Sequence, residues 1–255
     1  MSLTFFSFGR RQRTLFVLAV LVLAIGAPGP SARAYAADCP SFEEPKINVQ
    51  PIYTTPHYND TLGLKELRIM SGQPDSTYAG LHNLPVGLTA SSLRIDSSFE
   101  VTIRTTSQDP MACAQISRFD LEFGFDDTTV YLARELPFHS CGYETVLEHE
   151  SRHVAADQYL LASYLPQLPA LLADTIRRAG VIRAASPETA EEHLNNVMRN
   201  YLRDMSASIA SVRDKLQRQI DSPEEYKRIS RSCNGEIAHV LGYEPLPPDP
   251  VTVIE

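Results

Sequence analysis

A chain of 255 residues with a formal net charge of −8 is long enough to bury one sizeable core. This acidic balance argues against nucleic-acid binding, which requires a basic surface, and against adhesion to anionic lipid. The sequence also has no glycine-rich phosphate-binding loop and no internal repeat.

Residues 1–37 are typical of a secretory signal peptide. A basic stretch precedes an apolar run at 15–27, and small residues then allow cleavage after Ala34, Ala36 or Ala37. The apolar run is shorter than the roughly 20 residues of a membrane-spanning helix. We therefore expect a Sec-type signal, export to the periplasm or the medium, and no stable membrane insertion after cleavage.

Four cysteines remain after that cleavage: Cys39, Cys113, Cys141 and Cys233. An even number in an oxidising compartment predicts two disulfides, for which three pairings exist. We favour Cys113–Cys141 with Cys39–Cys233, because the first bridge would tie the last strands to the following helix. A cysteine zinc site is not expected, since no C-x-x-C pair occurs.

The first part of the mature chain, residues 38–136, has the pattern of a β-sheet. Apolar and polar residues alternate, or β-branched residues gather, at 46–50, 99–105, 119–123 and 128–132. Turn-forming residues separate these segments at 71–75, 83–85, 108–110 and 125–127. We expect a mostly antiparallel sheet of four to six strands, with one face on the core.

The second part, residues 137–240, is predicted to be helical, so that 38–240 form one α+β domain. The first helix has no glycine or proline between Tyr143 and Leu165, and a second at 169–179 ends at Gly180. Ser186 followed by Pro187 starts a long third helix.

Its apolar residues recur every three or four positions: Leu194, Met198, Tyr201, Met205, Ile209, Val212, Leu216 and Ile220. That stripe fits packing against the sheet and the first helix, or a coiled-coil dimer seam. A short helix after Ser222 and Pro223 ends near 233–235, and 241–255 form a proline-rich tail. The oligomeric state does not follow from these features.

The predicted first helix contains the pentapeptide H-E-x-x-H at residues 149–153. Residues four apart lie on the same helical face, so His149 and His153 can bind one zinc ion. Glu150 beside them is placed to act as general base, taking a proton from zinc-bound water and passing it to a leaving amine. The alternative is an exposed, charged helix whose histidines bind nothing.

This helix resembles the active-site helix of the zincin metallopeptidases. With the signal peptide and the β-rich first half, the chain also resembles, more loosely, bacterial proteins described as predicted secreted zinc-dependent proteases. The resemblance implies one Zn²⁺ per chain held by His149 and His153, Glu150 as the catalytic base, and a protein or peptide substrate. Arg152 departs from the uncharged residues usual in zincins, although it lies off the ligand face.

A catalytic zinc site normally has a third protein ligand. The metzincin pattern is absent, because Ala156 and Tyr159 stand where it requires glycine and histidine. The gluzincin scheme takes an acid from a later helix, and the candidates are Glu191, Asp174, Glu192, Glu224 and Glu225, with His193 as an outsider. Glu191 is marginally favoured, because it lies one helical step before Leu194. The alternative is that acids occur at the starts of these helices only because the helix dipole favours them there.

Asp157 lies one turn after His153 on the same helical face. The span from His149 to Asp157 is too long for all three side chains to bind one metal ion. Asp157 fits equally well as a partner that orients His153 and as a solvated charge. Tyrosines near the motif are more typical of packing than of oxyanion binding: Tyr143, Tyr159 and Tyr164. The other histidines have no paired spacing: His57, His82, His139, His193 and His239.

Three functions are compatible with these features of the sequence. The first is an exported zinc peptidase that cleaves amide bonds with Glu150 as general base. The second is a non-catalytic exported binding protein in which the metal motif is structural or degenerate. The third is a metal-dependent hydrolase of another bond, such as an amide in cell-wall material, because the same zinc chemistry serves several carbonyl substrates.

Overall fold

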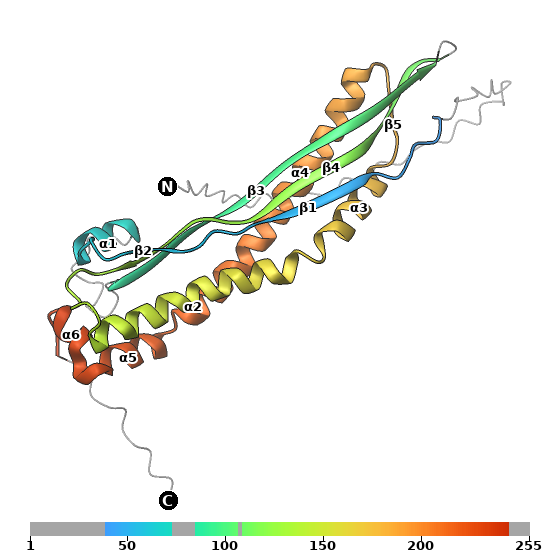
Figure 1. Ribbon diagram of the computed structural model, residues 1–255. Helices are drawn as coiled ribbons and strands as arrows, with labels where there is room; N and C mark the ends of the chain where they lie inside the picture. The colour runs from blue at the N-terminus through green and yellow to red at the C-terminus, as the bar shows by residue number, and fades with distance from the viewer. Residues whose placement is uncertain (1–38, 73–84, 107–108, 245–255) are drawn as a thin grey trace, which may run out of the picture. The chain divides into compact units, whose positions relative to one another are not determined.

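The protein is described by a computed structural model that covers residues 39–72, 85–106 and 109–244. These residues form an α+β fold in which a five-stranded sheet is followed by a helical C-terminal half (Figure 1). The expected signal peptide, His82 and the tail beyond residue 244 lie outside the described residues. Within the described part, no helix is long and apolar enough to cross a membrane.

The sheet is organised around its longest strand, β4 (Asp109–Leu132). β3 (Gly87–Thr106) pairs antiparallel with β4 along nearly its whole length. Three shorter strands pair with β4 in succession: β5 (Ile182–Ala184), β1 (Lys46–Ile52) and β2 (His57–Asn59). β1 and β2 run parallel to β4, and β5 runs antiparallel to it.

The expectation of a mostly antiparallel sheet is therefore wrong, because β1 and β2 are both parallel to the strand that they pair with. Both precede β3 in the chain and reach β4 without a hairpin. The alternation of apolar and polar residues reports which face of a strand is buried. It does not report the direction of the neighbouring strand, so the sequence pattern could not distinguish the two arrangements.

The segment expected to form a turn at 125–127 instead lies within β4, as an irregularity of a continuous strand. Asp127 has a φ of +51°, in the left-handed region that aspartate tolerates better than most residues. The pairing with β3 shifts register between Ala90 and Ser92 at the same place, as in a β-bulge. Ser91 lies at this bulge, and its hydroxyl contacts Asp157 on the first long helix.

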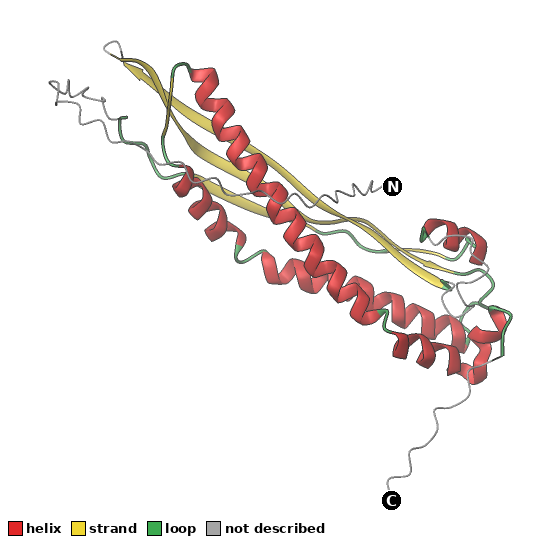
Figure 2. Ribbon diagram, turned by 180° about the vertical axis from the view of Figure 1, so that it is seen from behind, coloured by secondary structure: helices red, strands yellow, loops and turns green. Residues whose placement is uncertain are grey.

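Three helices cover one face of the sheet: α2 (Cys141–Tyr164), α3 (Leu168–Ala179) and α4 (Pro187–Ile220) (Figures 1 and 2). The expected start of α4 is confirmed, since the Ser186 hydroxyl accepts a hydrogen bond from the Thr189 amide. Its apolar stripe packs within the chain, with Leu194, Met198 and Ile209 in the main core. This core includes Phe119 and Phe123 of β4.

A second, smaller core lies around the start of α2. It joins that helix to α1 (Leu64–Met70), α5 (Pro223–Arg231) and α6 (Glu236–Val240). The 3₁₀ turn η2 (Cys233–Gly235) lies between α5 and α6 in the chain. The buried side chains of this core include Leu67, Tyr143, Val146, Ile229 and Ile237. This packing holds α5, which follows directly after α4, against the first turns of α2.

Two disulfides are present, as the cysteine count predicted, but both pairings differ from the favoured ones. Cys39 pairs with Cys113, and Cys141 pairs with Cys233. Cys113 lies near the start of β4, whereas α2 begins after the end of that strand. At about 3.3 Å per residue, the intervening strand spans roughly 60 Å, too far for a Cys113–Cys141 bridge.

We predict that proteolysis of the oxidised protein followed by peptide mapping will find Cys39–Cys113 and Cys141–Cys233. Replacing Cys141 and Cys233 by serine should lower the free energy of unfolding by roughly 2–5 kcal/mol, because the bridge closes a loop between residues 92 apart. Denaturant unfolding with and without the paired substitution measures this loss. Recovery of a peptide that links Cys113 to Cys141 would contradict the fold.

Candidate metal centre

α2 presents the three motif residues on its buried face. Ser140 caps the helix by accepting a hydrogen bond from the Tyr143 amide, which fixes where its first turn begins. His149, Glu150 and His153 are only 5%, 4% and 8% exposed. The motif is therefore not a solvated helix surface, which was the alternative left by the sequence.

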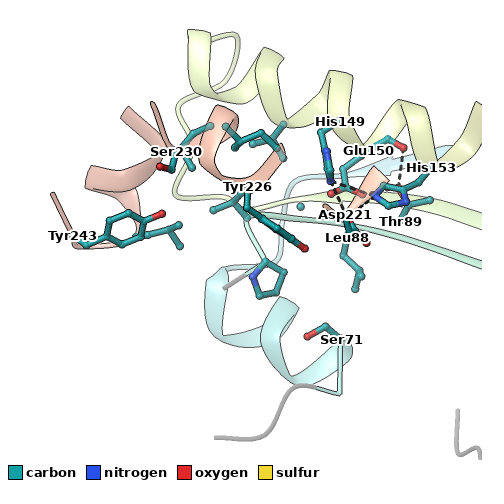
Figure 3. A pocket seen from close by; sticks show the side chains of 17 residues that line it. Ser71, Leu88, Thr89, His149, Glu150, His153, Asp221, Tyr226, Ser230 and Tyr243 are labelled. Atoms are coloured by element: carbon teal, nitrogen blue, oxygen red, sulfur yellow. Dashed lines mark hydrogen bonds and ion pairs between the residues drawn. The ribbon is translucent and has the colours of Figure 1, made fainter. Parts of the chain in front are cut away.

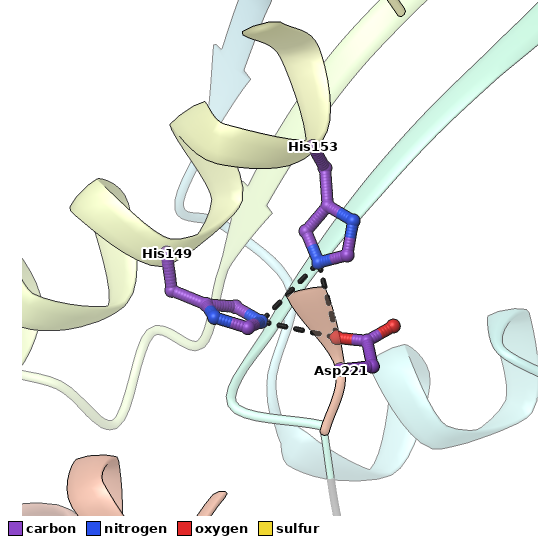
Figure 4. A group of neighbouring side chains, drawn as sticks. All are labelled: His149, His153 and Asp221. Atoms are coloured by element: carbon purple, nitrogen blue, oxygen red, sulfur yellow. Dashed lines mark hydrogen bonds and ion pairs between the residues drawn. The ribbon is translucent and has the colours of Figure 1, made fainter. Parts of the chain in front are cut away.

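Asp221 completes a compact group of three donor atoms with the two histidines (Figure 4). The two Nε2 atoms are 3.2 Å apart, and Asp221 Oδ1 lies 3.2 Å from that of His149 and 3.1 Å from that of His153. Tetrahedral ligands about 2.0–2.1 Å from a zinc ion are about 3.3 Å from one another. The spacing of the three atoms therefore fits a single metal ion at their centre.

Asp221 is the C-terminal capping residue of α4, and sequence reasoning missed it. The candidates from the sequence are acids within the later helices, whereas Asp221 follows the end of α4, directly after Ile220. Its side chain is 38% exposed. Burial raises the pKa of the Asp221 carboxyl, but the hydrogen bonds and charges of His149 and His153 outweigh it and hold that pKa well below its usual range.

None of the acids expected as third ligand belongs to the group. Asp174 pairs with Arg177 and Arg178 on α3. The next four are exposed on α4 and α5: Glu191, Glu192, His193 and Glu224. Only Glu225 comes near, and its carboxylate faces the other ring nitrogen of His149, with Oε1 3.3 Å from Nδ1. The preference for Glu191 was therefore wrong.

Glu225 lies in a cluster of charges that also explains Arg152. Arg152 and Arg228 both donate hydrogen bonds to its carboxylate, and Arg152 NH2 lies 3.0 Å from His149 Nδ1. The Glu225 side chain is 11% exposed. When a metal occupies Nε2 of His149, the ring proton is on Nδ1, and Glu225 is the acceptor placed to receive it. Arg152 thus holds an outer partner of the centre.

Glu150 lies beside the donor group and is anchored from β3. The Thr89 hydroxyl donates to Glu150 Oε2 at 2.7 Å, which leaves Oε1 available for another partner. Burial raises the pKa of this carboxyl, although the Thr89 hydrogen bond and both histidines oppose the rise. Gly87 allows the strand to approach this closely, because a Cβ there would stand 2.6 Å from Glu150 Oε1 and from Val146 Cγ1.

A cavity of about 220 Å³ opens next to these residues (Figure 3). One end is polar, with the three donors, Glu150 and Thr89, and the remaining wall is largely apolar: Val86, Leu88, Val146, Ile229, Ile237 and Leu241. Tyr226 also lines the cavity; burial, with Asp221 and Glu150 nearby, raises its pKa to about 12. The three tyrosines considered from the sequence do not line it.

Comparisons with protein-family models, with curated proteins and with solved structures find no match to this chain. The described residues establish that His149, His153 and Asp221 can hold a metal ion.

We predict that Asp221→Ala will weaken zinc binding by more than about 100-fold, because it removes a direct ligand rather than an outer partner. Competition with a chromophoric chelator measures the affinity. Asp214→Ala is the matched control, since Asp214 is exposed on the same helix, and it should bind zinc like the wild type. Glu191→Ala should also have no effect; loss of zinc binding in that variant would contradict the assignment of Asp221.

Zinc affinity should fall as the pH falls, because a histidine must be neutral to bind the metal. Burial lowers the pKa of His153, but hydrogen bonds with Asp221 and Gln217 outweigh it, so that pKa lies above its ordinary value. Protons therefore compete with zinc already above pH about 6.5. Chelator competition between pH about 6 and about 8 tests this, and an affinity constant across that window would refute it.

Proposed function

We propose that this protein is a zinc-dependent hydrolase of amide bonds, with peptides as its substrates. The observation that carries the proposal is the arrangement around the donor group. Two imidazole nitrogens and one carboxylate oxygen converge at 3.1–3.2 Å, with a buried carboxyl beside them and a cavity in front. Three protein ligands and an open position distinguish a catalytic zinc site from a closed structural one.

The donor set supports zinc among the available metals. Imidazole suits zinc, copper, iron and nickel, whereas sites made only of oxygen suit magnesium and calcium. Two nitrogens and one carboxylate oxygen are one of the ligand combinations found in catalytic zinc sites. Zinc bound there would polarise a carbonyl group and lower the pKa of a water molecule.

Glu150 is proposed to move the proton. Thr89 holds one carboxylate oxygen, so the other oxygen stays free to accept a proton from water and to deliver it to the leaving amine. A pKa raised by burial brings this carboxyl closer to the operating pH, where general acid–base catalysis is most effective. Gly87 keeps β3 close enough to α2 for this hydrogen bond.

The cavity supports a peptide substrate with an apolar side chain next to the cleaved bond. Its apolar wall adjoins the donor group directly, and enclosing an aliphatic side chain there would contribute roughly 1.5–3 kcal/mol. Tyr226 remains protonated at neutral pH, since its pKa is about 12. Its hydroxyl is therefore a hydrogen-bond donor for an oxygen that gains charge during the reaction.

Export to an oxidising compartment is part of the proposal. Both disulfides are compatible with it, because such bridges persist mainly outside the cytosol. All four cysteines are used in the two bridges.

We predict that Glu150→Gln will retain one zinc per chain but hydrolyse peptides about 10²–10⁴-fold more slowly, because the general base is lost while the ligands remain. Elemental analysis gives the zinc content, and fluorogenic peptides with apolar residues around the cleaved bond give the rate. Glu148→Gln, an exposed change on the same helix, should leave both unchanged.

Unaltered hydrolysis by Glu150→Gln would overturn the assigned mechanism. Zinc-loaded wild-type protein that binds such peptides without cleaving them would favour the non-catalytic binding function.

A further inference from the structure

α2 and α4 face each other through three polar contacts at matched helical spacing. On α2 the residues are His149, His153 and Asp157, each four apart. Opposite them, Arg213 and Gln217 of α4 and its C-terminal cap Asp221 are also four apart. His149 contacts Asp221, His153 contacts Gln217, and Asp157 contacts Arg213. The two helices therefore run antiparallel here, and the donor group lies at one end of a longer polar row.

The far end of the row is a buried ion pair. Arg213 Nε and NH2 donate to the two carboxylate oxygens of Asp157 at 2.7 and 2.8 Å, and NH2 also contacts the Ser91 hydroxyl at 2.7 Å. Asp157 is 4% exposed, and the guanidinium lies 5.2 Å from the centre of the Phe125 ring. Ser91 donates to Asp157 as well, at 2.6 Å. This geometry excludes the alternative of Asp157 as a solvated charge.

Gln217 connects this ion pair to the donor group. Its Nε2 donates to Asp157 Oδ1 at 2.9 Å, and its Oε1 contacts Nδ1 of His153. Asp157 does not touch His153 through any described hydrogen bond, so it cannot orient the ring directly. Its influence on His153 passes through the amide of Gln217.

From Arg213 to the Nδ1 atom of His153, the order of donors and acceptors has one consistent solution. Guanidinium only donates, and a carboxylate only accepts. Asp157 must therefore face the NH₂ group of Gln217, which turns the carbonyl oxygen of that amide toward His153. A carbonyl oxygen only accepts, so the ring nitrogen facing it, Nδ1, must carry the proton. In the neutral ring, Nε2 then carries the lone pair, which a metal bound between His149, His153 and Asp221 would require.

We propose that Gln217 is a positioning residue for the metal centre, and that the Asp157–Arg213 ion pair sets its direction. Together they hold the proton of neutral His153 on Nδ1 and present Nε2 as a ligand. The inference rests on the proposed metal centre and is independent of whether the protein cleaves peptides. Nδ1 of His149 instead faces an acceptor, the Glu225 carboxylate, and a donor, the Arg152 guanidinium, so the same argument applies to His153 alone.

Zinc affinity gives the first test. Gln217→Met keeps the length of the side chain but removes the acceptor, and we expect zinc to bind about 10–100-fold more weakly, as is typical when an outer partner of a ligand is lost. Gln219→Met is the matched control, an exposed glutamine on the same helix, and should bind zinc like the wild type. Wild-type affinity in Gln217→Met would overturn the proposal.

A second variant tests whether the direction of the hydrogen bonds, and not the shape of the side chains, determines the zinc affinity. Asp157→Asn preserves shape, but its amide also donates, so Gln217 is free to turn its NH₂ group toward His153. We expect a similar loss of zinc affinity with little change in the circular dichroism spectrum. This substitution leaves Arg213 without its charge partner and can therefore prevent folding. If Asp157→Asn does not fold, the proposal is decided by Gln217→Met and by the spectroscopic test below.

The proton position is read directly in metal-free protein by nuclear magnetic resonance of ¹⁵N-labelled histidine rings. Asp221→Ala removes the carboxylate that competes for the proton at Nε2, and at pH about 9 the ring is neutral. The signals of His153 are identified by their absence from the spectrum of His153→Gln. In Asp221→Ala we expect the His153 ring in the Nδ1–H form. Adding Gln217→Met to Asp221→Ala should shift this ring toward the Nε2–H form.

An Nε2–H ring in Asp221→Ala would overturn the proposal even if zinc binding behaved as expected. Because this readout needs neither metal nor hydrolysis, it remains valid if the protein proves not to be a peptidase. Failure of the proposed function would instead appear as absent hydrolysis with the zinc and proton results intact.

Discussion

The centre depends on the antiparallel register in which α4 packs against α2. That register brings Asp221, the residue that caps the C-terminus of α4, to the two histidines in the middle of α2. The apolar stripe of α4 packs into the main core beside the sheet, and the second core holds α5 at the start of α2. A shift of one helical turn, about 5.4 Å, would leave the histidines without a third donor. Packing far from the centre therefore determines its geometry.

The same register gives each histidine its own outer partner. His149 faces Glu225, which is held by two arginines, whereas His153 faces Gln217, which is held by the Asp157–Arg213 pair. Outer partners of this kind fix the orientation of a histidine ring and raise its basicity as a ligand. Arg152 departs from the usual zincin motif, and its contact with Glu225 gives that departure a local structural reason.

Local features of the sequence predicted much of the helical half. Three of these features depend only on residues close in the sequence. They are the helix cap at Ser186, the absence of glycine and proline after Tyr143, and the spacing of His149 and His153. Strand direction, disulfide pairing and the third donor depend on which distant segments meet. β1 was found, but its parallel pairing was not; Cys113 was expected beside Cys141, although a long strand separates them. Asp221 gave no local signal, because only the register between two helices places it at the histidines.

We propose that two histidines and one aspartate form the protein's part of a zinc site. X-ray absorption at the zinc edge of the loaded protein tests it most directly, because the ligands themselves scatter. We expect two imidazoles and lighter oxygen donors at about 2.0–2.1 Å, with one imidazole lost in His153→Gln. A sulfur ligand at about 2.3 Å, or a spectrum unchanged in His153→Gln, would contradict it.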